Sequence, residues 1–118
     1  NQILNEIVNS SDDNIGAEAY FLIAEIANQQ GDFKASIDHC IEIISKYGSY
    51  QQWTDETYLL LVKNYRDLGE ILQAKATLNS IIENTTNEVL KKRASEILVE
   101  VLVEESKVLV TEEDTTGE

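Results

Sequence analysis

The strongest constraint on this sequence is an internal repeat with a spacing of 38 residues. The stretch Tyr20–Phe33 is echoed by Tyr58–Ile71, and each is an amphipathic run of about three helical turns. Each run ends at a glycine, Gly31 or Gly69, followed by an acidic and then an apolar residue. Further equivalent pairs are Tyr20 and Tyr58, Ile23 and Leu61, Ala27 and Tyr65, and Ser36 and Ala74. A fixed internal period is typical of stacked supersecondary units, and here it predicts stacked helical hairpins.

Apolar residues at spacings of three and four predict helices over 15–30, 33–47, a segment from near Tyr50 to the turn at Gly69, 71–84 and about 88–105. We expect Gly31 to supply the left-handed conformation that a helix C-terminus often needs, and Asp32 to cap the next helix. The residues expected on the buried faces are, in chain order, Ala19, Tyr20, Ile23, Ala24, Ala27, Phe33, Ile37, Cys40, Ile41, Ile44, Tyr47, Trp53, Thr57, Tyr58, Leu61, Val62, Tyr65, Ile71, Ala74, Leu78, Ile81, Ile82, Leu90, Ala94, Ile97, Leu98, Val101 and Leu102.

The two ends of the sequence differ from this repeating pattern. Residues 1–14 carry an apolar helical face, and we expect them to be the second helix of a preceding repeat whose first helix is absent. The segment 87–110 reads as a C-terminal capping helix, and 111–118 as an acidic, disordered tail. Because the chain contains no Met, we expect a fragment or a processed product.

The net charge of the chain limits the classes of molecule that it is expected to bind. The formal net charge is −13, which disfavours binding to nucleic acid and to anionic membrane surfaces but is compatible with a basic or neutral peptide. No apolar run approaches the roughly 18 residues that a membrane-spanning helix needs, so we expect no membrane insertion. A single cysteine excludes an internal disulfide.

The repeated residues resemble the tetratricopeptide repeat, whose pattern is Trp-x2-Leu-Gly-x2-Tyr, then Ala-x3-Phe, then Pro. The matching segments are Tyr20–Ala27, Gly31–Phe33 and Ser36–Cys40 in the first unit, and Tyr58–Tyr65, Gly69–Ile71 and Ala74–Leu78 in the second. The resemblance implies an all-α, right-handed superhelix of helical hairpins with five helices, with repeats at 15–48 and 50–86. It also implies a non-catalytic scaffold that binds a protein or peptide partner on its concave face.

The sequence also departs from the family pattern. Ser36 replaces the usual small Ala, Val62 stands where Gly is expected, no Pro ends either unit, and the period exceeds the usual one of about 34 residues. The sequence as a whole is similar to those of bacterial tetratricopeptide proteins linked to the cell envelope. This likeness favours the periplasmic side of a bacterial envelope over the cytoplasm, but the compartment stays open.

Nothing in the sequence has the spacing of a catalytic, metal or cofactor site. His39 and Cys40 are adjacent on a helix, about 100° apart, so they do not face each other. Neither residue has the spacing of a zinc ligand set. We therefore expect no enzyme activity, no metal and no cofactor.

The candidate binding surface is the face of the first helix of each hairpin that is not expected to pack in the core. Its members are Glu18, Phe21, Leu22, Glu25, Asn28 and Gln29 in the first hairpin, and Glu56, Leu59, Leu60, Lys63, Arg66 and Asp67 in the second. Two interpretations of the apolar members Phe21, Leu22, Leu59 and Leu60 stay open: they pack on neighbouring helices, or they form the floor of a partner groove. An alternative function is self-association, with a homodimer formed through Ile3, Leu4, Ile7 and Val8 of the N-terminal helix.

Overall fold

The computed structural model describes the backbone of residues 14–116 and the side chains of residues 15–108. Within this range the chain forms five α-helices and no strand, which confirms the all-α class. The helices are α2 (Asn14–Gln29), α3 (Phe33–Lys46), α4 (Gln51–Asp67), α5 (Ile71–Asn84) and α6 (Glu88–Thr116). They fall into two compact units that divide between Gly69 and Glu70, inside the predicted repeat 50–86.

The repeat is visible in the lengths and turns of the helices. Helices α3 and α5 both have 14 residues and begin and end at positions separated by the repeat spacing. The turns before them contain the two glycines of positive φ found in the described chain, Gly31 at 82° and Gly69 at 77°. Asp32 accepts a hydrogen bond from the backbone N–H of Ala35 at 3.2 Å, and so caps α3 as predicted.

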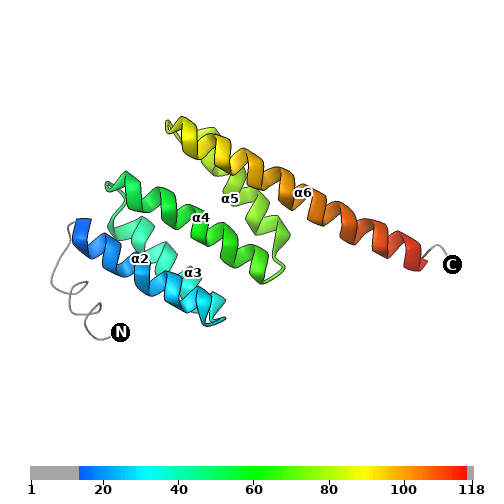
Figure 1. Ribbon diagram of the computed structural model, residues 1–118, viewed down its shortest axis with the longest axis horizontal. Helices are drawn as coiled ribbons and strands as arrows, with labels where there is room; N and C mark the ends of the chain where they lie inside the picture. The colour runs from blue at the N-terminus through cyan, green and yellow to red at the C-terminus, as the bar shows by residue number, and fades with distance from the viewer. Residues whose placement is uncertain (1–13, 117–118) are drawn as a thin grey trace. The chain divides into compact units, whose positions relative to one another are not determined.

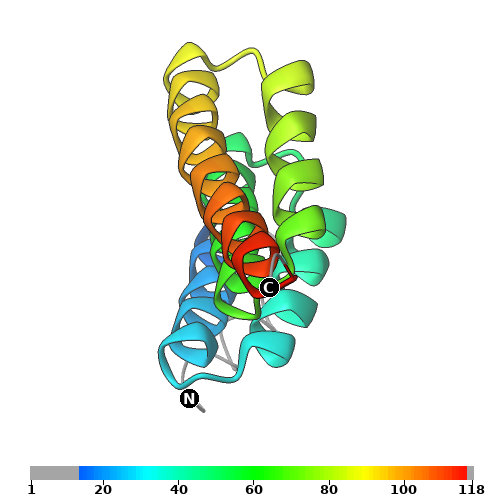
Figure 2. The ribbon, with the colours of Figure 1, turned by 90° about the vertical axis from the view of Figure 1, so that its right-hand side faces the viewer.

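In the first unit, α2, α3 and α4 pack around one hydrophobic core (Figures 1 and 2). Its buried members are Ala17, Phe21, Ala24, Cys40, Ile43, Tyr47, Leu60 and Leu61. The small side chains on α2 let the backbones of neighbouring helices approach, while the larger side chains of α3 and α4 fill the remaining space. One predicted core residue is wrong: Ile41 is 53% exposed, and Ile43 is buried instead. The two positions lie about 160° apart on a helix, so only one of them can face the core.

In the second unit, α5 packs against α6 (Figure 2). Asn87 starts α6, because its Oδ1 atom accepts hydrogen bonds from the backbone N–H groups of Val89 and Leu90 at 3.0 and 3.2 Å. Lys75 of α5 forms an ion pair with Glu105 of α6, with an N–O distance of 2.9 Å. Buried apolar residues of this unit are Ala74, Leu78, Ile81, Leu90, Ala94 and Val101.

The last helix, α6, extends further toward the C-terminus than the sequence analysis predicted. The capping helix was expected to end by residue 110 and to be followed by a disordered tail over 111–118, but α6 continues to Thr116. The sequence between these positions contains neither Pro nor Gly, and the first glycine is Gly117, so no residue there stops a helix. Leu102, which was predicted to be buried, is 45% exposed.

Two further expectations concern the N-terminal helix and membrane insertion. The predicted N-terminal helix with Ile3, Leu4, Ile7 and Val8 lies outside the described residues, so homodimer formation through it stays a prediction. Among the helices that the structure describes, none has both the length and the apolar character needed to cross a bilayer.

Candidate functional site

A buried polar network ties the three helices of the first unit together at Asn28 and Asn64. The Nδ2 atom of Asn28 on α2 donates to Oδ1 of Asn64 on α4 at 2.8 Å. Asn64 is fully buried, and its own Nδ2 atom donates to Oγ of Ser36 on α3 at 2.8 Å. Ser36 in turn donates to the backbone carbonyl of Ala24 at 2.7 Å. Both ends of the Asn64 amide are therefore satisfied, which is the condition for burying an amide at low cost.

At its outer edge the network continues to two charged residues of α4. Nζ of Lys63 donates to Oδ1 of Asn28 at 2.9 Å and to Oδ2 of Asp67 at 2.9 Å. Asn28 Nδ2 also donates to the same Asp67 oxygen at 3.2 Å. Burial raises the pKa of Asp67, but the hydrogen bonds from Lys63 and Asn28 outweigh this effect and hold the pKa below its ordinary value. Lys63 is thus engaged within the protein rather than available as an independent cation.

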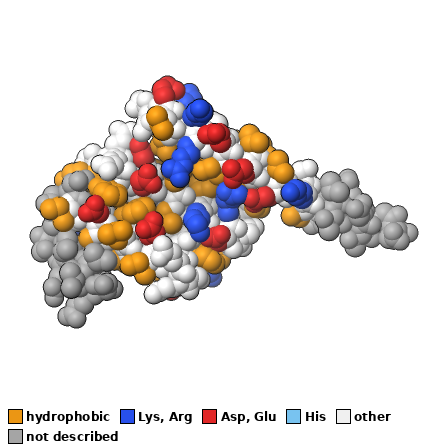
Figure 3. Space-filling model, viewed as in Figure 1, with side chains coloured by type: hydrophobic (Ala, Val, Ile, Leu, Met, Phe, Trp, Pro, Cys, Tyr) orange, Lys and Arg blue, Asp and Glu red, His pale blue; other side chains and the backbone are white. Residues whose placement is uncertain are grey.

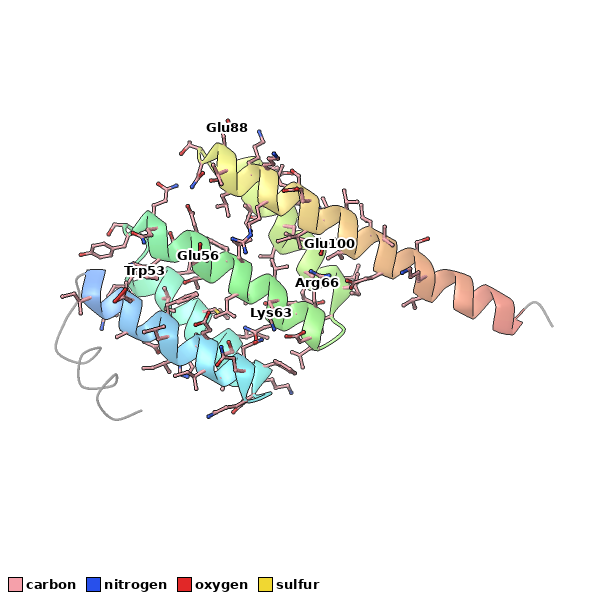
Figure 4. The ribbon with its side chains drawn as sticks, in the orientation of Figure 1. Trp53, Glu56, Lys63, Arg66, Glu88 and Glu100 are labelled. Atoms are coloured by element: carbon pink, nitrogen blue, oxygen red, sulfur yellow. The ribbon has the colours of Figure 1, made fainter. Side chains whose placement is uncertain are left out.

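A cleft of about 420 Å³ lies above this network, between α2 and α4. Its lining, which defines the α2–α4 cleft, is Glu25, Asn28, Gln29, Gly31, Phe33, Leu60, Lys63 and Asp67. All of these residues belong to the first unit. Figure 4 shows Trp53, Glu56, Lys63 and Arg66 following one another along α4, with Lys63 toward its C-terminal half, where the cleft lies.

The predicted surface residues separate into three groups. Glu25, Gln29, Leu60 and Lys63 line the α2–α4 cleft, together with Asn28 and Asp67 of the same predicted faces. Glu18, Leu22, Leu59, Arg66 and Glu56 are at least partly exposed but do not line this cleft. Phe21 does not belong to a groove floor, because it is 9% exposed and packs in the core.

The apolar floor predicted from Phe21, Leu22, Leu59 and Leu60 is therefore wrong as a continuous surface. The rings of Phe21 and Trp53 lie 5.8 Å apart between centroids, and Leu60 is 7% exposed within the same core cluster. Which of the two interpretations applies, packing on neighbouring helices or lining a partner groove, depends on the residue. Phe21 packs on neighbouring helices, whereas Leu60 both packs in the core and lines the cleft. The face shown in Figure 3 has hydrophobic side chains over α2 with acidic ones among them.

Two contributions to this site were missed by the sequence analysis. Phe33 was assigned only to the core, although it is half-buried and lines the cleft. Ser36 was interpreted as a substitute for a small Ala, whereas its hydroxyl is part of the polar network. The signal that could have found the network is the presence of Asn64 between apolar residues of an inner face, since a buried amide requires partners.

Cys40 and His39, the two residues considered for chemistry in the sequence, do not line the α2–α4 cleft. Burial raises the pKa of the Cys40 thiol to about 12, so the thiol stays protonated at neutral pH. His39 contacts the ring of Tyr20, with 5.4 Å between centroids, and lines a smaller cleft of about 260 Å³ between α2 and α3. Burial and, second, the charge of Glu42 raise the pKa of Tyr20. Within the described residues no group of three or more His, Cys, Asp or Glu side chains could hold a metal ion.

Comparisons of the chain with protein-family models, with curated proteins and with solved structures find no match. The resemblance to the tetratricopeptide repeat therefore rests on the residues themselves. The absence of enzyme activity likewise stays a prediction.

Proposed function

We propose that the chain is a tetratricopeptide-like helical repeat whose first unit is a protein-interaction module. In this proposal the α2–α4 cleft binds an extended peptide segment that carries a basic residue next to an apolar one. The superhelical arrangement of the repeats belongs to the same proposal. Its support is the repeat itself: the turns that follow α2 and α4 each use a glycine of positive φ, 38 residues apart, and the helices after them are equal in length.

The observation that carries the choice of ligand is the chemical character of the cleft. Leu60 and Phe33 provide apolar surface, and Glu25 provides a carboxylate on the α2 side. Lys63 is held by Asp67 and Asn28, whereas no ion pair to Glu25 is found among the described residues. A lysine or arginine of a peptide could therefore meet Glu25 while a neighbouring apolar residue contacts Leu60.

The overall charge favours the same class of partner. A net charge of −13 attracts basic segments and slows the approach of acidic ones. The polar network beneath the cleft holds Asn28 and Lys63 in place, so these residues are positioned before a ligand arrives. Preorganisation of this kind reduces the entropy that binding would otherwise cost.

The test is a selection from a random peptide library on the purified protein, followed by anisotropy titrations of individual labelled peptides. We expect enrichment of peptides with Lys or Arg beside Leu, Ile or Phe. Glu25→Lys should weaken their binding at least tenfold, because it places a cation opposite the basic residue. Glu42→Lys is the matched control, since Glu42 is an exposed acid on α3 outside the cleft.

Two results would count against this function. Either the selection yields no shared basic and apolar pattern, or the selected peptides bind Glu25→Lys as tightly as the unmodified protein. Circular dichroism of each variant checks that the helical fold is retained, so that a loss of binding is attributed to the cleft.

A further inference from the structure

The ammonium group of Lys63 is hydrogen-bonded to two oxygen atoms from different helices. Its Nζ atom donates to Oδ1 of Asn28 on α2 and to Oδ2 of Asp67 on α4, both at 2.9 Å. All three residues line the α2–α4 cleft, and Figure 4 shows Lys63 where α4 runs beside α2. Two acceptors that converge on one nitrogen match a primary ammonium, which carries all its donors on a single atom.

The two acceptors are positioned by contacts that do not involve Lys63. Asn28 is 6% exposed, and its Nδ2 atom donates to Oδ1 of the fully buried Asn64 at 2.8 Å and to Oδ2 of Asp67 at 3.2 Å. An amide nitrogen has two hydrogen atoms, so these bonds use both of them and fix the direction in which the Asn28 amide points. We therefore expect the two oxygens to keep their positions when the ammonium leaves.

The Lys63 ammonium is held less firmly than its acceptors. The side chain of Lys63 is 60% exposed, and that of Asp67 is 34% exposed. In the second unit, by contrast, the side chains of Lys75 and Glu105 are 26% and 31% exposed, and Nζ of Lys75 donates to both carboxylate oxygens. Exposed pairs four residues apart on a helix contribute little to stability, because water screens the charges and a long side chain loses conformational freedom. Lys63 can thus leave Asp67 at low cost.

We propose that Asn28 and Asp67 form a binding site for a primary ammonium, and that Lys63 fills this site until an ammonium of the ligand replaces it. The inference rests on the proposed function, and it identifies the basic residue of the bound peptide as lysine. Glu25 attracts this lysine to the cleft, and Asn28 and Asp67 accept hydrogen bonds from its Nζ atom. The Lys63 side chain then extends into water. One ammonium replaces another, so the charge bound at Asp67 is unchanged.

The geometry favours lysine over arginine as the ligand. The two acceptors belong to different side chains and converge on one nitrogen. A guanidinium group instead spreads its donors over a planar fork, which fits the two oxygens of a single carboxylate. Lys63 also acts as an internal competitor, because the ligand gains only the difference between its own ammonium and that of Lys63. Since the pair that Lys63 forms is weak, we expect its removal to raise the affinity for an ammonium about threefold.

The experiment is an NMR titration of the full chain with n-butylammonium chloride, which carries the same ammonium group as a lysine side chain. In Lys63→Ala we expect a saturable shift of the Asn28 side-chain amide resonances, with an affinity about threefold higher than in the unmodified protein. Lys34→Ala is the matched control, since Lys34 is an exposed lysine on α3 outside the cleft, and it should behave as the unmodified protein does.

Two further controls separate hydrogen bonding from general attraction to an acidic protein. Tetramethylammonium chloride has the same charge as n-butylammonium but no N–H donor, so it should cause no saturable shift in Lys63→Ala. Adding Asp67→Asn to Lys63→Ala should abolish the shift caused by n-butylammonium, because it removes the charge at the site while leaving a side chain of the same shape.

A second arm of the experiment uses a lysine-containing peptide from the library selection. Lys63→Ala should bind this peptide about threefold more tightly than the unmodified protein does, because no internal ammonium has to leave. The same peptide with arginine in place of its lysine should bind both proteins equally, since the guanidinium does not use the site.

Two results of the titration would overturn the ammonium site. One is the absence of a saturable shift with n-butylammonium in Lys63→Ala, and the other is an equal shift with tetramethylammonium. Backbone amide spectra of each variant check that the fold is retained. Lys63→Ser, which also vacates the site, takes the place of Lys63→Ala if that variant does not fold.

Failure of the proposed function would look different from failure of this inference. A library selection without basic peptides, together with a saturable n-butylammonium shift, would remove the peptide ligand and support the ammonium site. Lysine-containing peptides that depend on Glu25 but bind Lys63→Ala no more tightly would support the proposed function and overturn the exchange with Lys63.

Discussion

Asn28 and Asn64 are hydrogen-bonded to each other inside the first unit, with 2.8 Å between Nδ2 and Oδ1, although they lie 36 residues apart in the chain. The pair is not related by the repeat, whose spacing is 38 residues. It connects the outer ion pair of Lys63 and Asp67 to the inner hydroxyl of Ser36. One continuous set of hydrogen bonds therefore joins the floor of the α2–α4 cleft to the contacts between α2, α3 and α4.

Asn64→Ala should lower the free energy of unfolding by about 2 kcal/mol, because it removes several buried hydrogen bonds and leaves a small cavity. Chemical denaturation followed by circular dichroism measures the change. Asn79→Ala is the matched control, since Asn79 is exposed on α5 and its replacement by a better helix former should not destabilise the protein. Equal effects of the two variants would show that the Asn64 contacts do not stabilise the unit.

The two turn glycines should resist substitution because of their backbone conformation alone. A Cβ atom at Gly31 or Gly69 would meet nothing within 4 Å, yet both residues have a φ that other residues rarely adopt. We expect Gly31→Ala and Gly69→Ala each to cost about 1 kcal/mol in thermal or chemical melts. Gly31→Asn should cost less, although Asn is larger, because Asn tolerates this conformation. If Gly31→Asn lowers the free energy of unfolding more than Gly31→Ala does, then steric contact rather than backbone strain explains the need for glycine at this turn.

The thiol of Cys40 should react slowly with alkylating reagents in the folded protein. It is fully buried, and its pKa of about 12 leaves very little thiolate at pH 8. Labelling with iodoacetamide followed by mass spectrometry should be strongly suppressed relative to the protein in denaturant. Equally fast labelling in both states would mean that the helices around Cys40 open freely.

Asp67 should make the stability of the first unit depend on pH in the acid range. Its pKa in the folded protein is lowered, so its contribution to stability is present above the ordinary carboxyl pKa of 3.8 and is lost as the pH falls through the lower folded value. The difference in unfolding free energy between the unmodified protein and Asp67→Asn should thus be largest near neutral pH and shrink on acidification. Urea titrations at several pH values measure this difference.

The cause of this effect can be tested in the background of Lys63→Met. That substitution removes the main hydrogen-bond donor to Asp67, so the pH dependence of the Asp67→Asn difference should become weaker. A pH dependence that is the same in both backgrounds would assign the effect to a group other than the Lys63–Asp67 pair.

Local features of the fold could be predicted from the sequence because they depend on neighbouring residues. The period of three and four located the helices, Gly31 and Gly69 marked the turns, and Asp32 was predicted to cap α3. The end of α6 was misjudged, because acidic and polar composition suggested a tail although no residue before Gly117 stops a helix.

The candidate site depended on information that only the tertiary structure contains. A helical period defines an apolar face, but it does not say which neighbouring helix covers the residues at its edges. Phe21 is therefore in the core although it was predicted to face a partner, and Leu60 is shared between the core and the cleft. The sequence by itself determined the all-α class, the turns at Gly31 and Gly69 and most of the buried positions. The partners of Asn28, Ser36 and Asn64 were decided by tertiary packing, because hydrogen bonds between side chains distant in sequence form only where the packed helices bring them within reach.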